Sequence, residues 1–296
     1  MTARVFVFGS LHLDVIVTAP RLPRTDETLM GDAVRYEFGG KGGNQALAAA
    51  RMGVPVSMAG RVGDDAFADQ IKDRLQASGV DHAQVLRKPG ATGMSVAIVD
   101  RKGDYGAIVV SGVNRTILSG DVAMPGDTRI LCLQNEIPEE RNLTLARAAR
   151  ARGITVMLNA APARPTSPDL LALVDVLIVN RVEGHDISGK SDPQDILPAL
   201  ASLGPDCVIL TLGAEGAMLR TPDTPARHFP ACPVDVISTH GAGDAFAGTL
   251  AAELARGSTV RAALAFAQAA AALHVSTPIE DRASITRDTV TRFLTP

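Results

Sequence analysis

Cysteine and excess charge are scarce in this chain, and each shortage excludes a class of protein. The 296 residues include three cysteines (Cys132, Cys207 and Cys232), which cannot all pair and are not spaced as CxxC. A disulfide framework or a cysteine-bound metal cluster is therefore not expected. The formal net charge of −3 gives no basic surplus, which argues against nucleic acid or an anionic membrane as the main partner.

Long apolar runs and common hydrolase motifs are also missing. Residues 262–275 are apolar but too few to span a bilayer, and Gln268 interrupts them. The first residues lead directly into a short predicted strand without a recognisable secretory signal, so we expect a cytoplasmic protein. None of the six histidines stands at HxxxH spacing and no GxSxG motif is present, which leaves a histidine metal site and a serine hydrolase unsupported.

What the chain does contain is an alternation of short β-branched runs with amphipathic helical stretches. This alternation predicts βαβ units and a mostly parallel sheet covered by helices on both faces. We expect strands at residues 5–8, 56–59, 130–134, 155–158, 176–179 and 207–212, and helices at 44–52, 66–78, 139–152 and 193–203. Ligands of such sheets bind beyond the carboxyl ends of the strands, so the residues after each strand carry the functional information.

Four further β-like segments interrupt this pattern, at residues 14–18, 34–38, 94–100 and 107–110. Only a polar turn at 100–104 separates the last two, which predicts a hairpin. We interpret the four as a small separate sheet, built from residues 12–38 and 93–110 of a single 1–296 domain. Such a sheet could act as a lid that excludes water from an active site. The alternative is an extension of the main sheet at its edge.

The most informative motif lies near the C-terminus. A β-prone segment at 234–237 leads to Ser238, Thr239 and His240, and then to Gly241, Ala242, Gly243 and Asp244, which open an alanine-rich helix. The free N–H groups of a first helical turn suit a phosphate or a developing anion. A carboxylate at this point suggests phosphoryl transfer, with Asp244 as the base that removes a proton from an acceptor hydroxyl. The alternative is a turn with an acidic helix cap.

Two N-terminal features suggest a polyol site. Residues 38–46 (FGGKGGNQA) have the wrong spacing for a Walker loop, but their glycines would let the backbone approach a sugar and Asn44 could bind its hydroxyls. Asp14 follows the first strand, where a carboxylate can accept hydrogen bonds from two neighbouring hydroxyls. A flexible turn and a surface aspartate are the competing interpretations. His12 and His240 lie inside these clusters, and for both we favour a non-catalytic polar contact.

Two strand ends in the second half suggest a nucleotide site. Asn180 and Glu183 follow the strand at 176–179 and could organise water around Mg²⁺. The same two residues also fit a capping box, with Asn180 as the N-cap. Thr211 to Gly216 end another strand and could contact nucleotide phosphates.

Together these motifs resemble the signatures of the ribokinase-like (PfkB) carbohydrate kinases. The two glycine motifs, the Asn180-x-x-Glu183 pair and Asn159-Ala160-Ala161-Pro162-Ala163 occur in that family's order over residues 5–294. Residues 38–42 and 159–164 are more similar to the ribokinase branch than to the phosphofructokinase branch. The resemblance implies a three-layer α/β sandwich with a mostly parallel sheet and a small β lid, often with a homodimer formed by lid packing.

The resemblance also implies an activity: an ATP-dependent sugar kinase that transfers the γ-phosphoryl group to a hydroxyl of ribose or a related free sugar, with Mg²⁺. Asp244 would be the base and the amides of Gly241, Ala242 and Gly243 the anion hole. The implied sugar-binding positions are His12, Asp14, Gly40, Lys41, Asn44 and Glu136. The implied nucleotide or Mg²⁺ positions are Asn180, Glu183, Thr211, Gly213, Gly216 and Gln268.

The sequence departs from the family pattern at three places. Ser238 stands where the family has an aspartate that helps to hold a monovalent cation, and residues 276–280 differ from the later loop of that site. We therefore do not expect a monovalent-cation site beside Ser238 and His240, and we expect K⁺ to activate the protein little. Ribokinases have asparagine where His12 stands, which affects the choice of sugar.

Two alternatives remain open. A nucleoside kinase of the same fold would need lid aromatics to stack a base, and Tyr36 and Phe38 are the only obvious candidates in a chain with 3% aromatic residues. A catalytically silent sugar-binding member is the other alternative, since a fold alone does not prove a function.

Overall fold

A large, mostly parallel sheet forms the centre of the protein. The computed structural model describes residues 4–100 and 105–295, and within them this sheet has nine strands in the order β13-β12-β11-β10-β9-β8-β1-β4-β5. The strands from β11 to β5 are parallel, whereas β12 and β13 run antiparallel at one edge. The strands are β1 (Arg4–Phe8), β4 (Val56–Val62), β5 (Asp81–Arg87), β8 (Thr128–Gln134), β9 (Thr155–Asn159), β10 (Val176–Asn180), β11 (Cys207–Thr211), β12 (Ala217–Thr221) and β13 (Thr224–Phe229).

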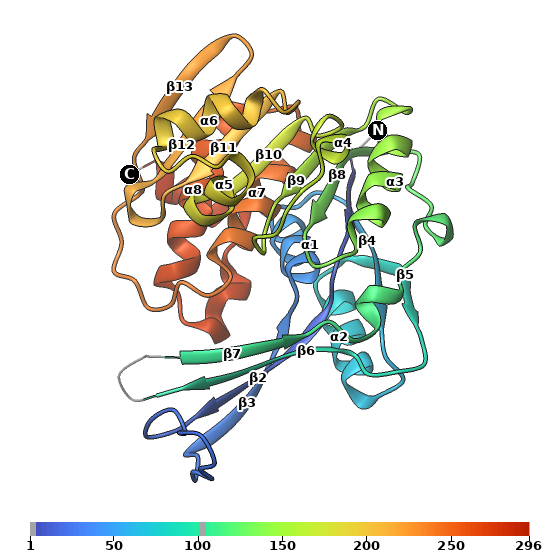
Figure 1. Cartoon of the computed structure of the whole chain (residues 1–296), viewed down its shortest axis with the longest axis vertical. Helices are drawn as coiled ribbons and strands as arrows, with labels where there is room; N and C mark the ends of the chain where they lie inside the picture. The colour runs from blue at the N-terminus through green and yellow to red at the C-terminus, as the bar shows by residue number, and fades with distance from the viewer. Residues whose placement is uncertain (1–3, 101–104, 296) are drawn as a thin grey trace.

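Helices cover both faces of this sheet, so two apolar cores form (Figure 1). Successive side chains of a strand point to opposite faces, and β1 shows it: Val5 and Val7 belong to one core, Phe6 and Phe8 to the other. The first face is covered by α1 (Lys41–Arg51), α2 (Ala66–Ala77), α7 (Ala242–Ala255), α8 (Val260–Ser276) and α9 (Arg287–Leu294). The second is covered by α3 (Glu139–Arg150), α4 (Pro168–Leu171), α5 (Arg181–Ser188) and α6 (Pro193–Ala201).

A second sheet projects from the main body, in the lower part of Figure 1. Its strands are β2 (His12–Thr18), β3 (Ala33–Gly39), β6 (Gly93–Val99) and β7 (Tyr105–Val110), in the order β3-β2-β6-β7. The β2–β6 pair is parallel, and the other two pairs are antiparallel. The expected separate sheet and its hairpin are thus present, and the interpretation as an edge extension of the main sheet is wrong. Residues 101–104 of the expected turn lie outside the described residues.

The short one-turn and two-turn helices connect these parts. They are the 3₁₀ segments η1 (Gly112–Thr116), η2 (Ser119–Asp121), η3 (Gly213–Glu215) and η4 (Ile279–Ser284). None of the helices in residues 4–100 and 105–295 is long and apolar enough to cross a membrane, α8 with its apolar stretch included.

The β-prone segment before the C-terminal glycine motif does not form a strand. Residues 234–237 are irregular, and Val236 and Ile237 are each 59% exposed. This run pairs with no strand of either sheet, and the N–H of Ile237 instead donates to Val275 O at the end of α8 (2.8 Å). Intrinsic β-propensity produces a strand only where a partner is available.

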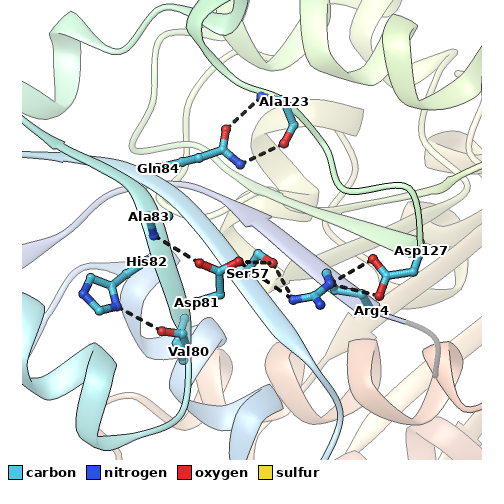
Figure 2. A network of polar contacts seen from close by, with 9 residues as sticks. All are labelled: Arg4, Ser57, Val80, Asp81, His82, Ala83, Gln84, Ala123 and Asp127. Carbon is cyan, nitrogen blue, oxygen red and sulfur yellow. Dashed lines mark hydrogen bonds and ion pairs between the residues drawn. The ribbon is translucent and has the colours of Figure 1, made fainter. Parts of the chain in front are cut away.

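A polar network ties the N-terminal strand to the β5 edge of the sheet (Figure 2). Arg4 donates to Asp127 (3.0 Å) and to Ser57 (2.8 Å), and Ser57 donates to Asp81 (3.2 Å). These contacts fix β1, β4 and β5 at their amino ends. The carboxyl ends of the same strands, where the candidate site lies, are left free of this network.

Candidate functional site

The predicted site residues gather at the carboxyl ends of the parallel strands, where α1 and α7 both begin. Ser10 follows β1, Glu136 follows β8, and Asn180 and Thr211 are paired at the ends of β10 and β11. The helices α1 and α7 pack very closely, because a Cβ at Gly248 would lie 2.3 Å from the backbone oxygen of Gln45. Their close packing brings residues 199 positions apart into contact.

Asp244 lies at the centre of this arrangement. It is the third residue of α7 and is 6% exposed. Its carboxylate accepts a hydrogen bond from the Gln45 side chain (3.1 Å) and one from Asn44 (3.4 Å). Burial raises the pKa of Asp244 above its ordinary value, although the charge of Lys41 and the two amide donors oppose that rise. A buried carboxylate with a raised pKa suits a general base.

Gln45 and Gln134 were not assigned a role by sequence reasoning, yet both support Asp244. Gln134 donates to the side-chain oxygen of Gln45 (3.0 Å), which leaves the Gln45 amide nitrogen directed at Asp244. Both glutamines are fully buried. Gln45 belongs to the glycine motif at residues 38–46, and its place next to Asn44 could have suggested a role in the site. No sequence motif pointed to Gln134.

The turn before α7 presents backbone N–H groups beside Asp244. Gly241 is the N-cap, with a φ of 77° that favours glycine, and the Ala242 N–H donates to Thr239 O (3.2 Å). The first-turn amides of Gly243 and Asp244 have no carbonyl four residues before them inside the helix. Gly243 is exposed, so its amide can reach a ligand.

The glycine loop before α1 is held in place by Glu136. The carboxylate of Glu136 accepts hydrogen bonds from the Lys41 N–H (2.9 Å) and from the Ser10 hydroxyl. Gly40 has a φ of 87°, and a Cβ there would lie 2.8 Å from the backbone nitrogen of His12. Glu136 therefore fixes the start of α1, whose first turn carries Lys41 and Asn44.

Lys41 links the acidic groups of the site. Burial acts to lower its pKa, but the charges of Asp244, Glu136 and Glu183 outweigh burial, so the pKa of Lys41 is raised. The ammonium group is therefore charged in the folded protein, and it balances carboxylates that come from three different elements.

His12 and Asp14 lie on the same side of β2, because they are two residues apart on a strand. Both are buried, and His12 Nε2 and Asp14 Oδ1 have no hydrogen-bond partner among the described residues. The other carboxylate oxygen, Asp14 Oδ2, lies 3.7 Å from His240 Nε2. This contact raises the pKa of His240 above its ordinary value, although burial acts against the rise.

Asn180 and Glu183 form the capping box of α5. The Asn180 side chain accepts from the Glu183 N–H (2.9 Å), and the Glu183 carboxylate accepts from the Asn180 N–H (2.8 Å). Glu183 is also buried, which raises its pKa; the Asn180 hydrogen bond and Lys41 lower it, and Asp244 raises it further. The pair therefore caps a helix, and the Glu183 carboxylate is part of the same charge network as Lys41 and Asp244.

The remaining predicted nucleotide positions surround the β11–β13 edge. Thr211 donates to Val179 O (3.3 Å). Gly216 and Gln268 meet at one backbone group: a Cβ at Gly216 would lie 2.1 Å from Phe229 O, and the Gln268 amide donates to the same oxygen (3.1 Å). Gly213 has a φ of 62° and open space around it. Gln268 and Gly216 thus fix the loop after β13, while Gly213 stays exposed at the strand end.

Comparison with known proteins gives a consistent match. Residues 2–281 match the family described as pfkB family carbohydrate kinase. The ribokinase of Bacillus subtilis (strain 168) is 34% identical over 275 residues, covering 92% of each chain, and the deoxyribokinase of Salmonella typhi is 31% identical over 283 residues, also covering 92% of each. The structure of Arabidopsis thaliana ribokinase complexed with ribose and ATP superposes with a TM-score of 0.91 at 28% identity, covering 100% of both chains.

Proposed function

The chain belongs to the pfkB family of carbohydrate kinases and is an ATP-dependent sugar kinase, and we propose that its acceptor is a free pentose, ribose or a close relative. The relatives that it matches over most of their length are named ribokinase and deoxyribokinase. Asp244 is the general base in this proposal. The amides of the turn from Gly241 to Gly243 form the anion hole for the transferring phosphoryl group.

One observation carries the choice of a hydroxyl-rich acceptor. Asp14 Oδ1 and His12 Nε2 are buried polar atoms without a partner among the described residues, and both project from β2 near the glycine loop. Buried polar groups are costly unless they form hydrogen bonds, so a ligand with neighbouring hydroxyls satisfies both. A carboxylate acceptor and an imidazole nitrogen fit a vicinal diol.

The reaction needs positioning and charge balance more than covalent chemistry. Asp244 accepts the proton of the attacking hydroxyl, and Gln45 and Asn44 hold its carboxylate toward the acceptor. Lys41 carries a full positive charge between Asp244, Glu136 and Glu183, where it stabilises the anionic groups that meet during transfer.

The acidic side chains fit a divalent cation. Burial raises the pKa of both Glu183 and Asp244, and the charge of Asp244 raises the pKa of Glu183 further. Mg²⁺ keeps most of its waters and needs only one or two carboxylates, so Glu183 would hold it through water. When bound with ATP, the ion would neutralise charge on the phosphate oxygens.

The nucleoside kinase alternative is less supported. Tyr36 packs against Phe67 with ring centroids 6.2 Å apart, and the Phe38 ring lies against Gly43. Phe38 therefore already packs within this chain, whereas Tyr36 contacts Phe67 and is still 56% exposed. A silent sugar-binding role does not explain why Asp244 is buried and held by two amide donors.

We also propose that two copies pair through the lid. Val34 and Tyr36 on β3 and Ile108 and Val110 on β7 are at least half exposed, with Ile108 at 72%. Exposed apolar patches of this kind mark association surfaces. In sedimentation analysis the wild type should be a dimer and Ile108→Glu a monomer. A wild type that sediments as a monomer would refute the pairing.

An ADP-release screen across pentoses, hexoses and nucleosides tests the acceptor. We expect ribose or a deoxy relative to give the highest kcat/KM, and Asp14→Asn to raise the KM for that sugar while the KM for ATP is unchanged. The matched control is Asp127→Asn, which alters the network of Figure 2 away from the site. A nucleoside as the best acceptor, or a normal sugar KM in Asp14→Asn, would overturn the proposal.

A further inference from the structure

Three backbone carbonyls beside the anion-hole turn converge on one guanidinium group. Arg282, in η4, donates from Nη2 to Ser238 O (3.2 Å), from Nη1 to His240 O (3.1 Å) and from Nε to Thr277 O (3.3 Å). The residue is 6% exposed. Two of the carbonyls belong to the turn before α7, and the third belongs to the residue that ends α8.

The contacts of Arg282 are with dipoles rather than with an acid. No carboxylate forms an ion pair with Arg282 among the described residues; the charge of Glu37 acts on it only at longer range. Sets of carbonyl oxygens that face one point are the usual way in which proteins hold a monovalent cation. Here the planar guanidinium, with five donors and a permanent charge, takes that central position.

The neighbouring histidine adds no second charge. His274 Nε2 lies 2.9 Å from His240 O, and burial, with the nearby arginines, lowers the pKa of His274 to about 4. The neutral ring therefore donates its N–H to the same carbonyl that Arg282 holds. His240 O is thus fixed from two sides, and the turn that it belongs to leads directly into Gly241 and the first amides of α7.

The side chain at position 238 fits this arrangement. Ser238 Oγ accepts from the His240 N–H (3.3 Å) and carries no charge. The family pattern has an acid here, which would help to hold a mobile cation. In this chain the acid is absent, and the carbonyls that a free cation would need are bound to Arg282. The residues present do not fit a potassium ion.

We propose that Arg282 is a built-in cation that replaces a monovalent metal ion beside the anion hole. It is a positioning residue: it holds the turn from Ser238 to His240 so that the amides of Gly241 to Gly243 point at the transferring phosphoryl group, and it keeps a fixed positive charge behind them. The inference rests on the proposed role of that turn and of Asp244.

The test compares cation dependence in the wild type and in variants of Arg282. Wild-type kcat should be the same in potassium, sodium and choline salts. Arg282→Ala should lose about 10-fold to 100-fold in kcat, because small misplacements of a catalytic group cost this much. Its rate should recover when guanidinium or potassium ion is added, since either can enter the emptied carbonyl set. Arg282→Met fills the space without a charge and should be slow without recovery.

Arg287→Ala is the matched control. Arg287 comes from the same C-terminal segment but pairs with the side chain of Glu253 (2.8 Å). It should lower thermal stability without creating a response to guanidinium or potassium. If Arg282→Ala does not fold, Arg282→Lys provides the test, and it should show partial activity that potassium does not raise.

Two results would overturn the inference. One is strong potassium stimulation of the wild type; the other is a slow, folded Arg282→Ala that neither ion restores. Neither result affects the sugar kinase assignment. Conversely, normal turnover in Asp244→Asn would refute the proposed function whatever Arg282 does, so the two failures can be told apart.

Discussion

The side-chain amide of Gln45 donates a hydrogen bond to the carboxylate of Asp244, 3.1 Å away and 199 positions later in the chain. Gln134 orients that amide through a second hydrogen bond of 3.0 Å. The proposed base is therefore supported by a fully buried chain of two glutamines. Such a chain fixes the direction of a carboxylate as well as its charge.

Gln45→Leu should reduce kcat about 10-fold while the KM for ATP stays unchanged. The Gln45 hydrogen bond lowers the pKa of Asp244, so its loss should also move the acid limb of the pH–rate profile to higher pH. Steady-state kinetics across pH checks both. Gln84→Leu serves as the control, because Gln84 bonds only to the backbone of Ala123, far from the site. A normal profile in Gln45→Leu would show that the contact does not tune Asp244.

This contact also marks the limit of what the sequence could predict. The six expected main-sheet strands and the separate small sheet are present. Strands that are buried on both faces appear as short apolar, β-branched runs, which can be recognised in the local sequence. The contact between Gln45 and Asp244 depends instead on the close approach of α1 and α7 at Gly248. Nothing local to Gln45 encodes it.

Two further features depend on tertiary contacts and could not be predicted from the local sequence. They are the lack of a strand at residues 234–237 and the role of Arg282. A β-prone run forms a strand only where it pairs with another strand, and residues 234–237 belong to neither sheet. Sequence reasoning assigned no role to Arg282. Only the fold shows that η4 places this guanidinium against the carbonyls of Ser238 and His240, more than 40 positions earlier in the chain.

Asp244→Asn should reduce kcat by about 10³-fold or more, because the amide cannot accept the proton of the acceptor hydroxyl. Nucleotide affinity, measured by calorimetry, should change little. In the wild type, kcat/KM should fall as the pH drops through the pKa of Asp244, at a higher pH than for an ordinary aspartate, since burial raises that pKa. Near-normal turnover of Asp244→Asn would contradict the assignment.

The same variant should be more stable than the wild type near neutral pH. The pKa of Asp244 is raised on folding, so the folded protein binds a proton more readily than the unfolded chain, and the ionised group disfavours folding as the pH rises. Asparagine removes this buried charge. Calorimetric melting curves should show a higher Tm for Asp244→Asn than for the wild type at pH 7, and a smaller difference in Tm at acid pH. A lower Tm of the variant at pH 7 would show that the ionised Asp244 does not destabilise the fold.

His240→Gln should change the KM for the sugar rather than kcat. The pKa of His240 is raised by its contact with Asp14, so the ring is charged below that pKa and becomes neutral as the pH rises through it. Loss of the charge frees Asp14 to accept sugar hydroxyls, so the wild-type sugar KM should fall with rising pH. The effect should be small, about twofold to threefold, because the His240 side chain is 60% exposed. His240→Gln should lose this pH dependence, while its backbone carbonyl still bonds to Arg282; an unchanged dependence would locate the titrating group elsewhere.

Gly40→Ala should abolish sugar phosphorylation, and a second glycine provides the control for backbone strain. Gly40 and Gly153 have similar positive φ values, 87° and 67°, so alanine costs each about 1 kcal/mol of conformational energy. A Cβ at Gly153 meets open space, whereas one at Gly40 lies 2.8 Å from His12 N and 2.9 Å from Ser10 O. Alanine at position 40 must therefore displace the start of α1, whose first turn carries Lys41 and Asn44. We expect Gly153→Ala to lower the Tm with normal kinetics and Gly40→Ala to remain folded without measurable ADP release. Equal activity in the two variants would show that the loop tolerates the displacement and that its position does not limit the reaction.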